Sequence, residues 1–304
     1  MLSGDRRALA RVISKIEGED SDTREMISKL YPHTGEAVTL GFTGPPGVGK
    51  SSIIARLIEL YRKEDKKVGV VSVDPSSPFT KGAILGDRIR LGDHFLDRGV
   101  FIRSMGSRGH LGGLAGASRL AGLAMEASGM DVVIYETVGV GQGEVEVASA
   151  ADTVVLALQP GAGDSVQALK AGVMEIADII CINKADHPQA KGSASEVRSI
   201  LEIGHELDPD APMPPIVMTR GDNGEGVEEL KEKISDHRTF LHKSGRIKER
   251  HLSSIKEFIL SWATNKMEKE MHERLSEEDA ELMEKVRKRE LDPISAAETL
   301  YRAV

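Results

Sequence analysis

The chain has 304 residues, of which 40% are hydrophobic and 29% charged, a mixture typical of a folded protein with a substantial core. Its formal net charge of −8 argues against a protein that holds nucleic acid or an anionic membrane through overall positive charge. A single cysteine, Cys181, excludes an intramolecular disulfide and any metal site built from several cysteines. No run of about 18 apolar residues occurs. We therefore expect a cytoplasmic protein without membrane or nucleic-acid partners.

In chain order, a helix-like segment over 5–31 comes first. Short runs rich in Val, Ile and Leu then predict strands at 37–44, 67–74, 131–137, 152–158, 178–183 and 215–219. Helix-like segments separate these runs at 50–62, 114–127, 165–174, 193–207 and 227–240. Apolar strands that alternate with helices are typical of parallel sheets covered on both faces. The pattern therefore predicts an α/β fold with a doubly wound, mostly parallel sheet.

The remainder of the chain is densely charged but electrically balanced, so the acidic excess lies in the first 240 residues. A helical stripe of apolar residues is formed by Ile255, Phe258, Ile259 and Trp262. Asp292 and Pro293 are typical of the N-cap and first position of a last helix over 294–302. We predict three parts: a helical N-terminal extension at 1–36, an α/β domain at 37–240 and a helical C-terminal arm at 241–304.

The segment GPPGVGKS at 44–51 follows an apolar strand and opens a helix, which is the context of a phosphate loop, or Walker A motif. Its glycines let backbone N–H groups turn toward an anion, and the helix N-terminus adds positive potential. Lys50 can reach the β- and γ-phosphates as a catalytic residue, and the Ser51 hydroxyl can bind Mg²⁺. The predicted phosphate-binding residues are Gly44, Pro45, Pro46, Gly47, Val48, Gly49, Lys50, Ser51 and Ser52.

The segment NKAD at 183–186 ends a predicted strand and resembles the guanine-reading loop of G proteins. There the aspartate, here Asp186, accepts hydrogen bonds from guanine N1–H and the 2-amino group, a donor pair that adenine lacks. Asn183 and Lys184 complete the box, and Lys184 would lie along the base. In the loop after the last strand, Thr219 and Arg220 are candidates to offer backbone N–H groups to guanine O6.

Two acidic residues end predicted strands, Asp74 and Glu136. Ligands bind at the carboxyl edge of a parallel sheet, and carboxylates there can hold Mg²⁺ directly or through water. Glu136 stands where a Walker B aspartate is expected, and a glycine-rich segment follows it. In that segment, Gly139 could sense the γ-phosphate through its N–H, and Gln142 could position the attacking water.

Several motifs run through the first 240 residues: GPPGVGKS, SVDPSSP, GDRIRL, SRGHLGGLA, ETVGVGQ, GDSVQALKAG, EIADI and NKAD. Together they resemble the MeaB/ArgK family, whose human relative is the methylmalonic aciduria type A protein. The resemblance implies a P-loop NTPase of the SIMIBI branch that binds GTP and GDP with Mg²⁺. It implies a GTPase, stimulated by its partner, that chaperones an adenosylcobalamin-dependent acyl-CoA mutase, chiefly methylmalonyl-CoA mutase. Its role would be to gate cofactor loading and to protect or reactivate the mutase.

The resemblance also implies roles for particular positions. Asp87 joins Ser51, Asp74 and Glu136 around Mg²⁺, and Lys170 in the third switch organises hydrolysis when the partner docks. The C-terminal arm is implied to form a homodimer.

Three alternatives remain open from the sequence. A transport-associated ATPase or kinase, once proposed for ArgK-like proteins, would not need the NKAD box. A nickel or cobalt metallochaperone GTPase would need a histidine-rich tract or clustered cysteines, whereas the nine histidines are scattered. A scaffold that binds nucleotide without hydrolysing it is disfavoured by the intact Lys50 and Ser51.

Overall fold

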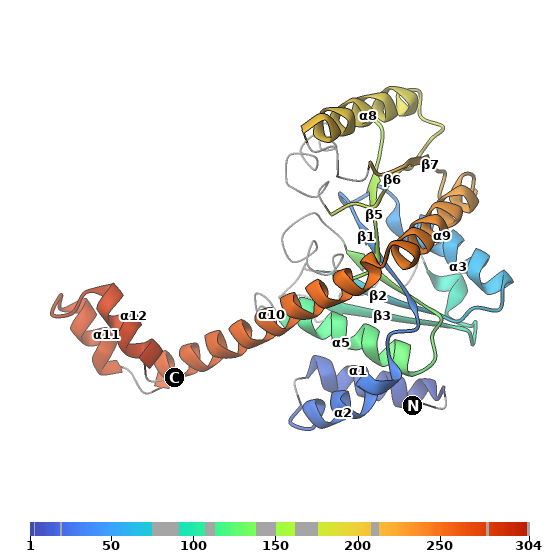
Figure 1. The fold of residues 1–304 in the computed structure, drawn as a ribbon. Helices are drawn as coiled ribbons and strands as arrows, with labels where there is room; N and C mark the ends of the chain where they lie inside the picture. Colours follow the sequence, from blue (N-terminus) through green and yellow to red (C-terminus); the bar gives the residue numbers. More distant parts are fainter. Residues whose placement is uncertain are drawn as a thin grey trace.

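The computed structural model describes residues 1–2, 4–18, 20–74, 91–106, 113–137, 150–161, 176–207, 213–277 and 280–302. Within this part of the chain a seven-stranded sheet has the order β3-β2-β4-β1-β5-β6-β7, and all neighbouring strands are parallel (Figure 1). The strands are β1 (Val38–Thr43), β2 (Val68–Asp74), β3 (Val100–Gly106), β4 (Val132–Thr137), β5 (Thr153–Leu158), β6 (Ile179–Ile182) and β7 (Ile216–Met218). The predicted α/β architecture is confirmed, and the sheet is parallel throughout.

Strand β3 is the one element of this sheet that the apolar runs do not predict. It lies at the edge of the sheet and pairs only with β2, from Val68 opposite Val100 to Asp74 opposite Gly106. Residues 102–104 in its middle are only half-buried, and two of them, Arg103 and Ser104, are polar. An edge strand with one exposed side needs no continuous apolar run, so the pattern used for buried strands passes over it.

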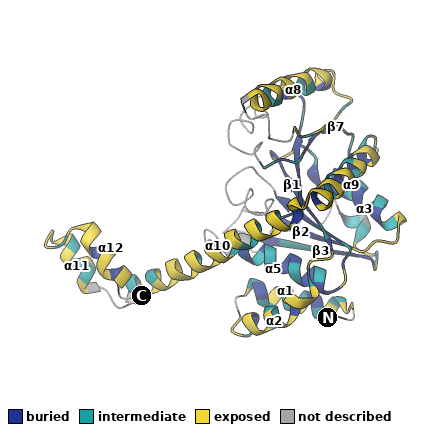
Figure 2. Cartoon of the chain, viewed as in Figure 1, coloured by how far each residue is buried: buried dark blue, intermediate teal, exposed yellow. Residues whose placement is uncertain are grey.

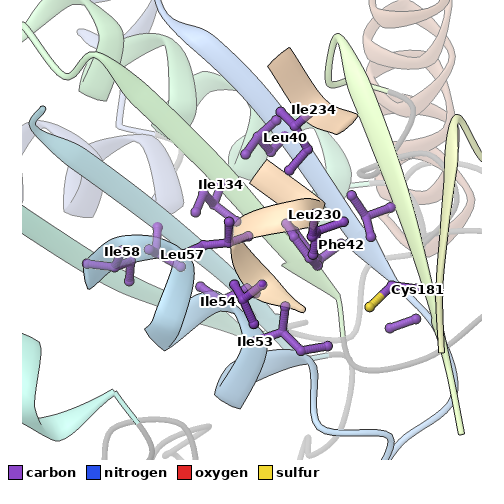
Figure 3. Packing of buried hydrophobic residues seen from close by; sticks show 14 of the residues in the cluster. Leu40, Phe42, Ile53, Ile54, Leu57, Ile58, Ile134, Cys181, Leu230 and Ile234 are labelled. Carbon is purple, nitrogen blue, oxygen red and sulfur yellow. The ribbon is translucent and has the colours of Figure 1, made fainter. Parts of the chain in front are cut away.

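Helices cover both faces of the sheet, as the doubly wound prediction requires. One face carries α3 (Lys50–Lys63) and α9 (Val227–Ser244), and the other carries α1 (Arg6–Glu17), α5 (Gly113–Ala127) and α8 (Ala190–Leu207). Side chains alternate between these layers along each strand, because successive residues of a strand point to opposite faces. In β2, Val70 joins the cluster with Leu57 of α3, while Val71 joins the cluster with Met125 of α5. Figure 3 shows the first of these clusters, which fills the space between α3, α9 and the central strands.

The predicted N-terminal helical segment is divided in two. Helix α1 begins at an N-cap, Asp5, whose carboxylate accepts hydrogen bonds from the backbone N–H groups of Arg7 and Ala8. A break follows before α2 (Thr23–Leu30) and the short 3-10 turn η1 (Tyr31–His33). The apolar stripe of α1 packs against α5 through Leu9, Ile13 and Ile16, so the extension shares the core of the sheet.

The C-terminal arm consists of α10 (Arg246–Glu277), α11 (Ala280–Arg287) and α12 (Pro293–Arg302). Helix α10 crosses α5 and then leaves the body, and most of its outer part is exposed (Figures 1 and 2). The predicted cap of the last helix is confirmed, since Asp292 Oδ1 accepts hydrogen bonds from Ile294 N and Ser295 N, both at 3.0 Å. Among the described helices, none combines the length and apolarity that crossing a membrane requires. The division into three parts stays a prediction.

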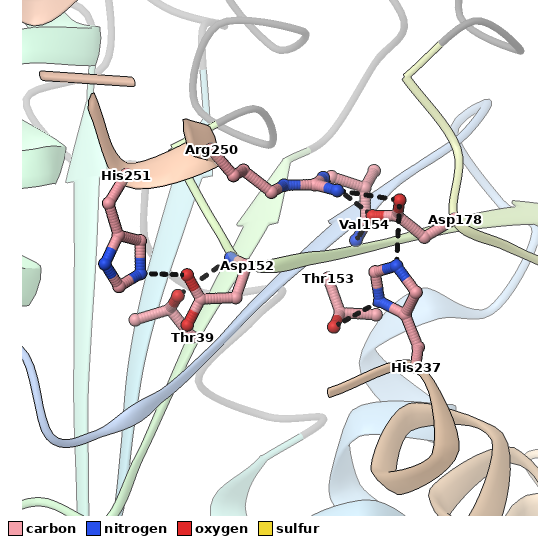
Figure 4. A network of polar contacts seen from close by, with 8 residues as sticks. All are labelled: Thr39, Asp152, Thr153, Val154, Asp178, His237, Arg250 and His251. Atoms are coloured by element: carbon pink, nitrogen blue, oxygen red, sulfur yellow. Dashed lines mark hydrogen bonds and ion pairs between the residues drawn. The ribbon is translucent and has the colours of Figure 1, made fainter. Parts of the chain in front are cut away.

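Charged side chains hold the start of α10 against the amino ends of β5 and β6 (Figure 4). Arg250 donates two hydrogen bonds to Asp178, at 2.8 and 2.7 Å, and His251 Nε2 lies 2.7 Å from Asp152 Oδ1. His237 of α9 lies between Asp178 and the Thr153 hydroxyl. Both aspartates immediately precede a strand, so this network connects the arm to the edge of the sheet where strands begin.

Candidate functional site

The phosphate loop connects the central strand β1 to helix α3, at the carboxyl edge of the sheet. Its backbone takes conformations that favour glycine, with φ of +142° at Gly44 and +94° at Gly49. A Cβ atom on Gly44 would lie 2.1 Å from the Ala157 carbonyl oxygen, and one on Gly49 would lie 2.4 Å from Asn183 Nδ2. These two glycines are therefore required by close packing against β5 and against the NKAD box.

Lys50 and Ser51 form the first turn of α3, and both side chains are buried. The Lys50 ammonium donates to the carbonyl oxygens of Gly44 and Pro45, at 2.6 and 2.9 Å. Ser51 Oγ donates to Glu136 Oε1 at 2.5 Å, and this buried carboxylate lies on β4, the neighbour of β1. The phosphate loop and the end of β4 therefore bring together one cation and one hydroxyl–carboxylate pair, the groups expected to contact phosphate and a divalent cation.

Asn183 connects the phosphate loop to the NKAD box and to the turn after β7. Its side-chain nitrogen donates to the Val48 carbonyl oxygen at 2.7 Å. Its oxygen accepts hydrogen bonds from the Gly221 N–H at 2.9 Å and from the Thr219 hydroxyl at 3.2 Å. One amide thus fixes three loops relative to one another, a role that only a group with both donors and an acceptor can fill.

Lys184 adopts a left-handed conformation, with φ of +59°, and extends over the phosphate loop. Its ammonium donates to the Gly47 carbonyl oxygen at 3.1 Å and to Gln159 Oε1 at 2.5 Å. Asp186, two residues later, is exposed and has Arg220 as its charged neighbour. The box therefore presents a carboxylate at the edge of the site beside a lysine that contacts the loop.

The turn after β7 differs from its expected role. The Thr219 N–H donates to the Ile182 carbonyl oxygen at 2.9 Å, and the Arg220 N–H donates to the Glu225 carbonyl oxygen at 2.8 Å. Neither N–H is therefore available for guanine O6 in this conformation. The Thr219 hydroxyl instead joins Asn183 to the thiol of Cys181, which lies 3.1 Å away. Burial raises the pKa of that thiol to about 12, which keeps it protonated and unreactive.

The remaining predicted residues are distributed as follows. Pro45 and Val48 are buried, Pro46 and Gly47 are exposed, and Ser52 is half-buried beneath Gly221. Asp74 ends β2 at the same edge of the sheet as Glu136, opposite Gly106 of β3, and its side chain is not described. Four predicted site residues lie outside the described residues: Asp87, Gly139, Gln142 and Lys170.

One residue in the site, Gln159, escapes the motif analysis, and another, Arg220, is predicted there for its backbone N–H and not for its side chain. Gln159 follows β5 and accepts the bond from Lys184, and its position at the carboxyl end of a strand beside β1 is the signal that could have identified it. Arg220 has its guanidinium rather than its backbone directed at the box. No local pattern predicts that contact, because α8 and β7 lie between Asp186 and Arg220 in the chain.

Comparisons with known proteins agree with this geometry. A family model described as methylmalonyl-CoA mutase-associated GTPase MeaB matches residues 7–277. A Pyrococcus abyssi protein named as a GTPase is 45% identical over 306 residues, covering 100% of this chain and 94% of that protein. The mitochondrial methylmalonic aciduria type A homolog of Caenorhabditis elegans is 31% identical over 328 residues, covering 99% and 80%. The crystal structure of an LAO/AO transport system kinase matches with a TM-score of 0.68 and 26% identity, covering 99% and 94%.

Proposed function

Because the chain belongs to the MeaB family of methylmalonyl-CoA mutase-associated GTPases, we propose that it chaperones an adenosylcobalamin-dependent acyl-CoA mutase, with methylmalonyl-CoA mutase as the partner. The chain is a GTPase, which binds guanine nucleotide and hydrolyses GTP to GDP and phosphate. In the proposed role, the GTP-bound and GDP-bound states differ in their affinity for the mutase. That difference gates loading of the cofactor and protects or reactivates the mutase.

The observation that carries the nucleotide site is the bridge made by Asn183. Its amide bonds Val48 of the phosphate loop and Gly221 of the turn after β7, while Lys184 lies over Gly47. A phosphate cradle and a base-recognition box are thereby held as one unit, as a ligand with a phosphate end and a purine end requires. We assign guanine recognition to Asp186 and phosphate binding to the loop 44–52.

The chemistry of the buried donors fits a magnesium ion. Ser51 Oγ and Glu136 Oε1 face one another at 2.5 Å, and both are hard oxygen donors of the kind Mg²⁺ prefers. We propose that these two side chains hold the ion, with Asp74 and Asp87 contributing directly or through water. When bound, Mg²⁺ neutralises charge on the β- and γ-phosphate oxygens.

The chain's own residues divide the work of hydrolysis. Lys50 exchanges its hydrogen bonds to the Gly44 and Pro45 carbonyl oxygens for bonds to phosphate oxygens. The phosphate oxygens are charged, so they are the stronger acceptors. Gly139 would contact the γ-phosphate through its N–H, Gln142 would orient water, and Lys170 would organise hydrolysis when the mutase docks. Because such catalysis is positioning and charge stabilisation, turnover of the isolated chain should be slow and stimulated by the partner.

Substitution of Asp186 by Asn tests the base assignment. The amide nitrogen can donate to the 2-oxo group of xanthine while the amide oxygen accepts from N1–H. With guanine, that nitrogen would face the 2-amino group, which is also a donor. We expect the variant to lose GTP affinity by at least about tenfold and to gain affinity for xanthosine triphosphate. Titration calorimetry with the two nucleotides measures this. Equal GTP binding by variant and wild type would remove Asp186 from base recognition. Competition by ATP as strong as that by GTP would instead favour the transport-kinase alternative.

The chaperone role is tested with the mutase itself. Candidate mutase subunits should co-purify with this chain to different extents in GDP and in a non-hydrolysable GTP analogue, and the mutase should raise the rate of phosphate release. We expect Lys170→Ala to keep GTP affinity while losing that stimulation. Nucleotide-independent co-purification, or no stimulation by any candidate mutase, would contradict the role.

We also propose that the arm forms a homodimer. On α10, Ile259, Leu260 and Trp262 are 59%, 67% and 43% exposed, which is costly for large apolar side chains in water. Light scattering should give twice the mass of one chain. A double Ile259→Asp and Leu260→Asp variant should give the mass of one chain. A wild-type protein with the mass of one chain at micromolar concentration would contradict the dimer.

A further inference from the structure

The turn after β7 is rigidly built, which gives its side chains fixed directions. Arg220 pairs with Glu225 as an antiparallel bridge across the turn, with hydrogen bonds from Arg220 N to Glu225 O and from Gly224 N to Arg220 O, both at 2.8 Å. At the end of the turn, Gly226 has a φ of +74°, and a Cβ there would lie 2.0 Å from the Met218 carbonyl oxygen. Arg56 of α3 donates to the Asp222 carbonyl oxygen at 2.7 Å. The turn is therefore closed on itself and attached to the phosphate-loop helix.

Three carboxylates surround the Arg220 guanidinium. Asp222 Oδ2 accepts a hydrogen bond from Nη2 at 2.9 Å, Asp186 Oδ1 lies 3.5 Å from Nε, and Glu225 Oε2 lies 3.9 Å from Nη1. Nε is buried and makes no hydrogen bond within the described part of the chain, although it is the atom that faces Asp186. Asp222 and Glu225 belong to the same turn, so they fix the guanidinium and leave its Nε directed at the NKAD box.

Within the described part of the chain, Arg220 is the charged group that lies against Asp186. Its side chain is 57% exposed, whereas that of Arg220 is 29% exposed. A carboxylate that accepts from both N1–H and the 2-amino group must be ionised and must lie in the plane of the base. A fixed cation beside one oxygen restricts rotation of the carboxylate and leaves the other lone pairs for the base.

We propose that the Arg220 side chain is a positioning residue for guanine specificity, which holds the Asp186 carboxylate in the orientation that accepts the two guanine donors. This rests on the proposed function, in which Asp186 reads the base. The prediction distinguishes Arg220 from a residue that only stabilises the turn. Loss of orientation should weaken the paired contact to guanine more than the single contact left to hypoxanthine, which lacks the 2-amino group.

The experiment measures binding of GDP and of inosine diphosphate to the full-length chain by titration calorimetry. Arg220→Ala should reduce the ratio of GDP to inosine diphosphate affinity by about two- to fivefold, the range of a single solvent-accessible ion pair. Arg220→Lys should restore part of that ratio, because its ammonium can still reach Asp186 without the fixed planar fork. Arg56→Ala is the matched control: it loosens the same turn at Asp222 without touching Asp186, and should leave the ratio unchanged.

A double variant separates this inference from the proposed function. Asp186→Asn should reduce the ratio on its own, and adding Arg220→Ala to it should change the ratio no further. If Arg220→Ala weakens both nucleotides by the same factor, Arg220 is a structural residue and the inference is overturned while base reading by Asp186 stands. If Asp186→Asn leaves the ratio as in the wild type, Asp186 does not read the base, and both assignments fall.

Discussion

The two edges of the sheet use polar side chains in opposite ways. At the carboxyl edge, Lys50 and Asn183 bond backbone carbonyl oxygens of the phosphate loop. At the amino edge, Asp178 and Asp152 bond the side chains of Arg250 and His251. The first arrangement joins side chains to loops, and the second joins opposite charges across three elements.

The difference follows from the topology. In a parallel sheet, helix N-termini and the loops that precede them collect at the carboxyl edge, where their N–H groups favour an anion. A lysine that rests on carbonyl oxygens can exchange them for phosphate at small cost. At the amino edge the charges already neutralise one another, and breaking any pair leaves a partly buried charge without its partner. One edge is thus suited to ligand exchange and the other to anchoring the arm.

The largest expected effect comes from a substitution that changes the carboxyl edge alone. Lys50→Ala should lower the GTP hydrolysis rate by at least about 100-fold, since it removes the one loop cation that stabilises charge on the transferred phosphoryl group. The urea unfolding midpoint should change much less than the rate, because the bonds from Lys50 to the Gly44 and Pro45 carbonyl oxygens lie within one loop. Lys63→Ala, at the exposed far end of the same helix, is the control and should keep the wild-type rate. A hydrolysis rate within threefold of wild type in Lys50→Ala would contradict the assignment.

The next largest effect comes from a substitution that changes the amino edge alone. Asp178→Ala removes both bonds to Arg250 and the bond from the Val154 N–H, and should reduce the free energy of unfolding by about 2–3 kcal/mol. GTP affinity should stay within twofold of wild type. Glu64→Ala breaks the ion pair with Lys231, which joins α3 to α9 at the surface, and should cost no more than about 1 kcal/mol. Loss of nucleotide affinity in Asp178→Ala, without loss of stability, would show that the edges are not separate in function.

Local patterns predicted most of the sheet because a strand that is buried on both faces has a run of consecutive apolar residues. The run at 152–158 is apolar after Asp152 and Thr153, and β5 is buried along its whole length. Strand β3 escaped because its half-exposed middle contains Arg103 and Ser104. The segment 5–31 was predicted as one helical stretch, whereas Gly18 ends α1. Caps and edges depend on a few residues, so they are harder to predict than the core.

The site divides in the same way. GPPGVGKS is contiguous, so its loop could be predicted from spacing alone. The contact from Asn183 to Val48 joins residues 135 apart in the chain, and only the fold brings them together. The pair of Arg250 and Asp178 was equally hidden, because a densely charged arm offers many cations and the sequence does not say which one reaches the sheet. The sequence does assign Ser51 and Glu136 to one magnesium ion, and these side chains meet in the structure, but these other long-range polar contacts were unpredicted at both edges.

The smallest expected effect probes the amino edge by pH. The hydrogen bond to Asp152 raises the pKa of His251 above its usual 6.5, and the Glu126 charge adds to this, while desolvation and Arg119 oppose it. Because the folded-state pKa is the higher one, this stabilisation is fully present below pH 6.5 and is lost as pH rises through the folded-state pKa. The histidine is 45% exposed, so the contribution should not exceed about 1 kcal/mol.

The measurement is the difference in unfolding free energy between wild type and His251→Gln across that pH range. Burial lowers the pKa of His237 in the same network. Its contribution to stability therefore has the opposite pH dependence, because the folded state loses stability as pH falls and the buried imidazole must be protonated. His237 is present in both proteins, so its contribution cancels in the difference to first order. The difference should be largest near pH 6 and should shrink toward pH 9, while GTP affinity in the two proteins stays the same. A difference that grows with pH would mean that Asp152 binds the neutral imidazole, so that the charge-to-charge contact of α10 in this network is the one from Arg250 to Asp178.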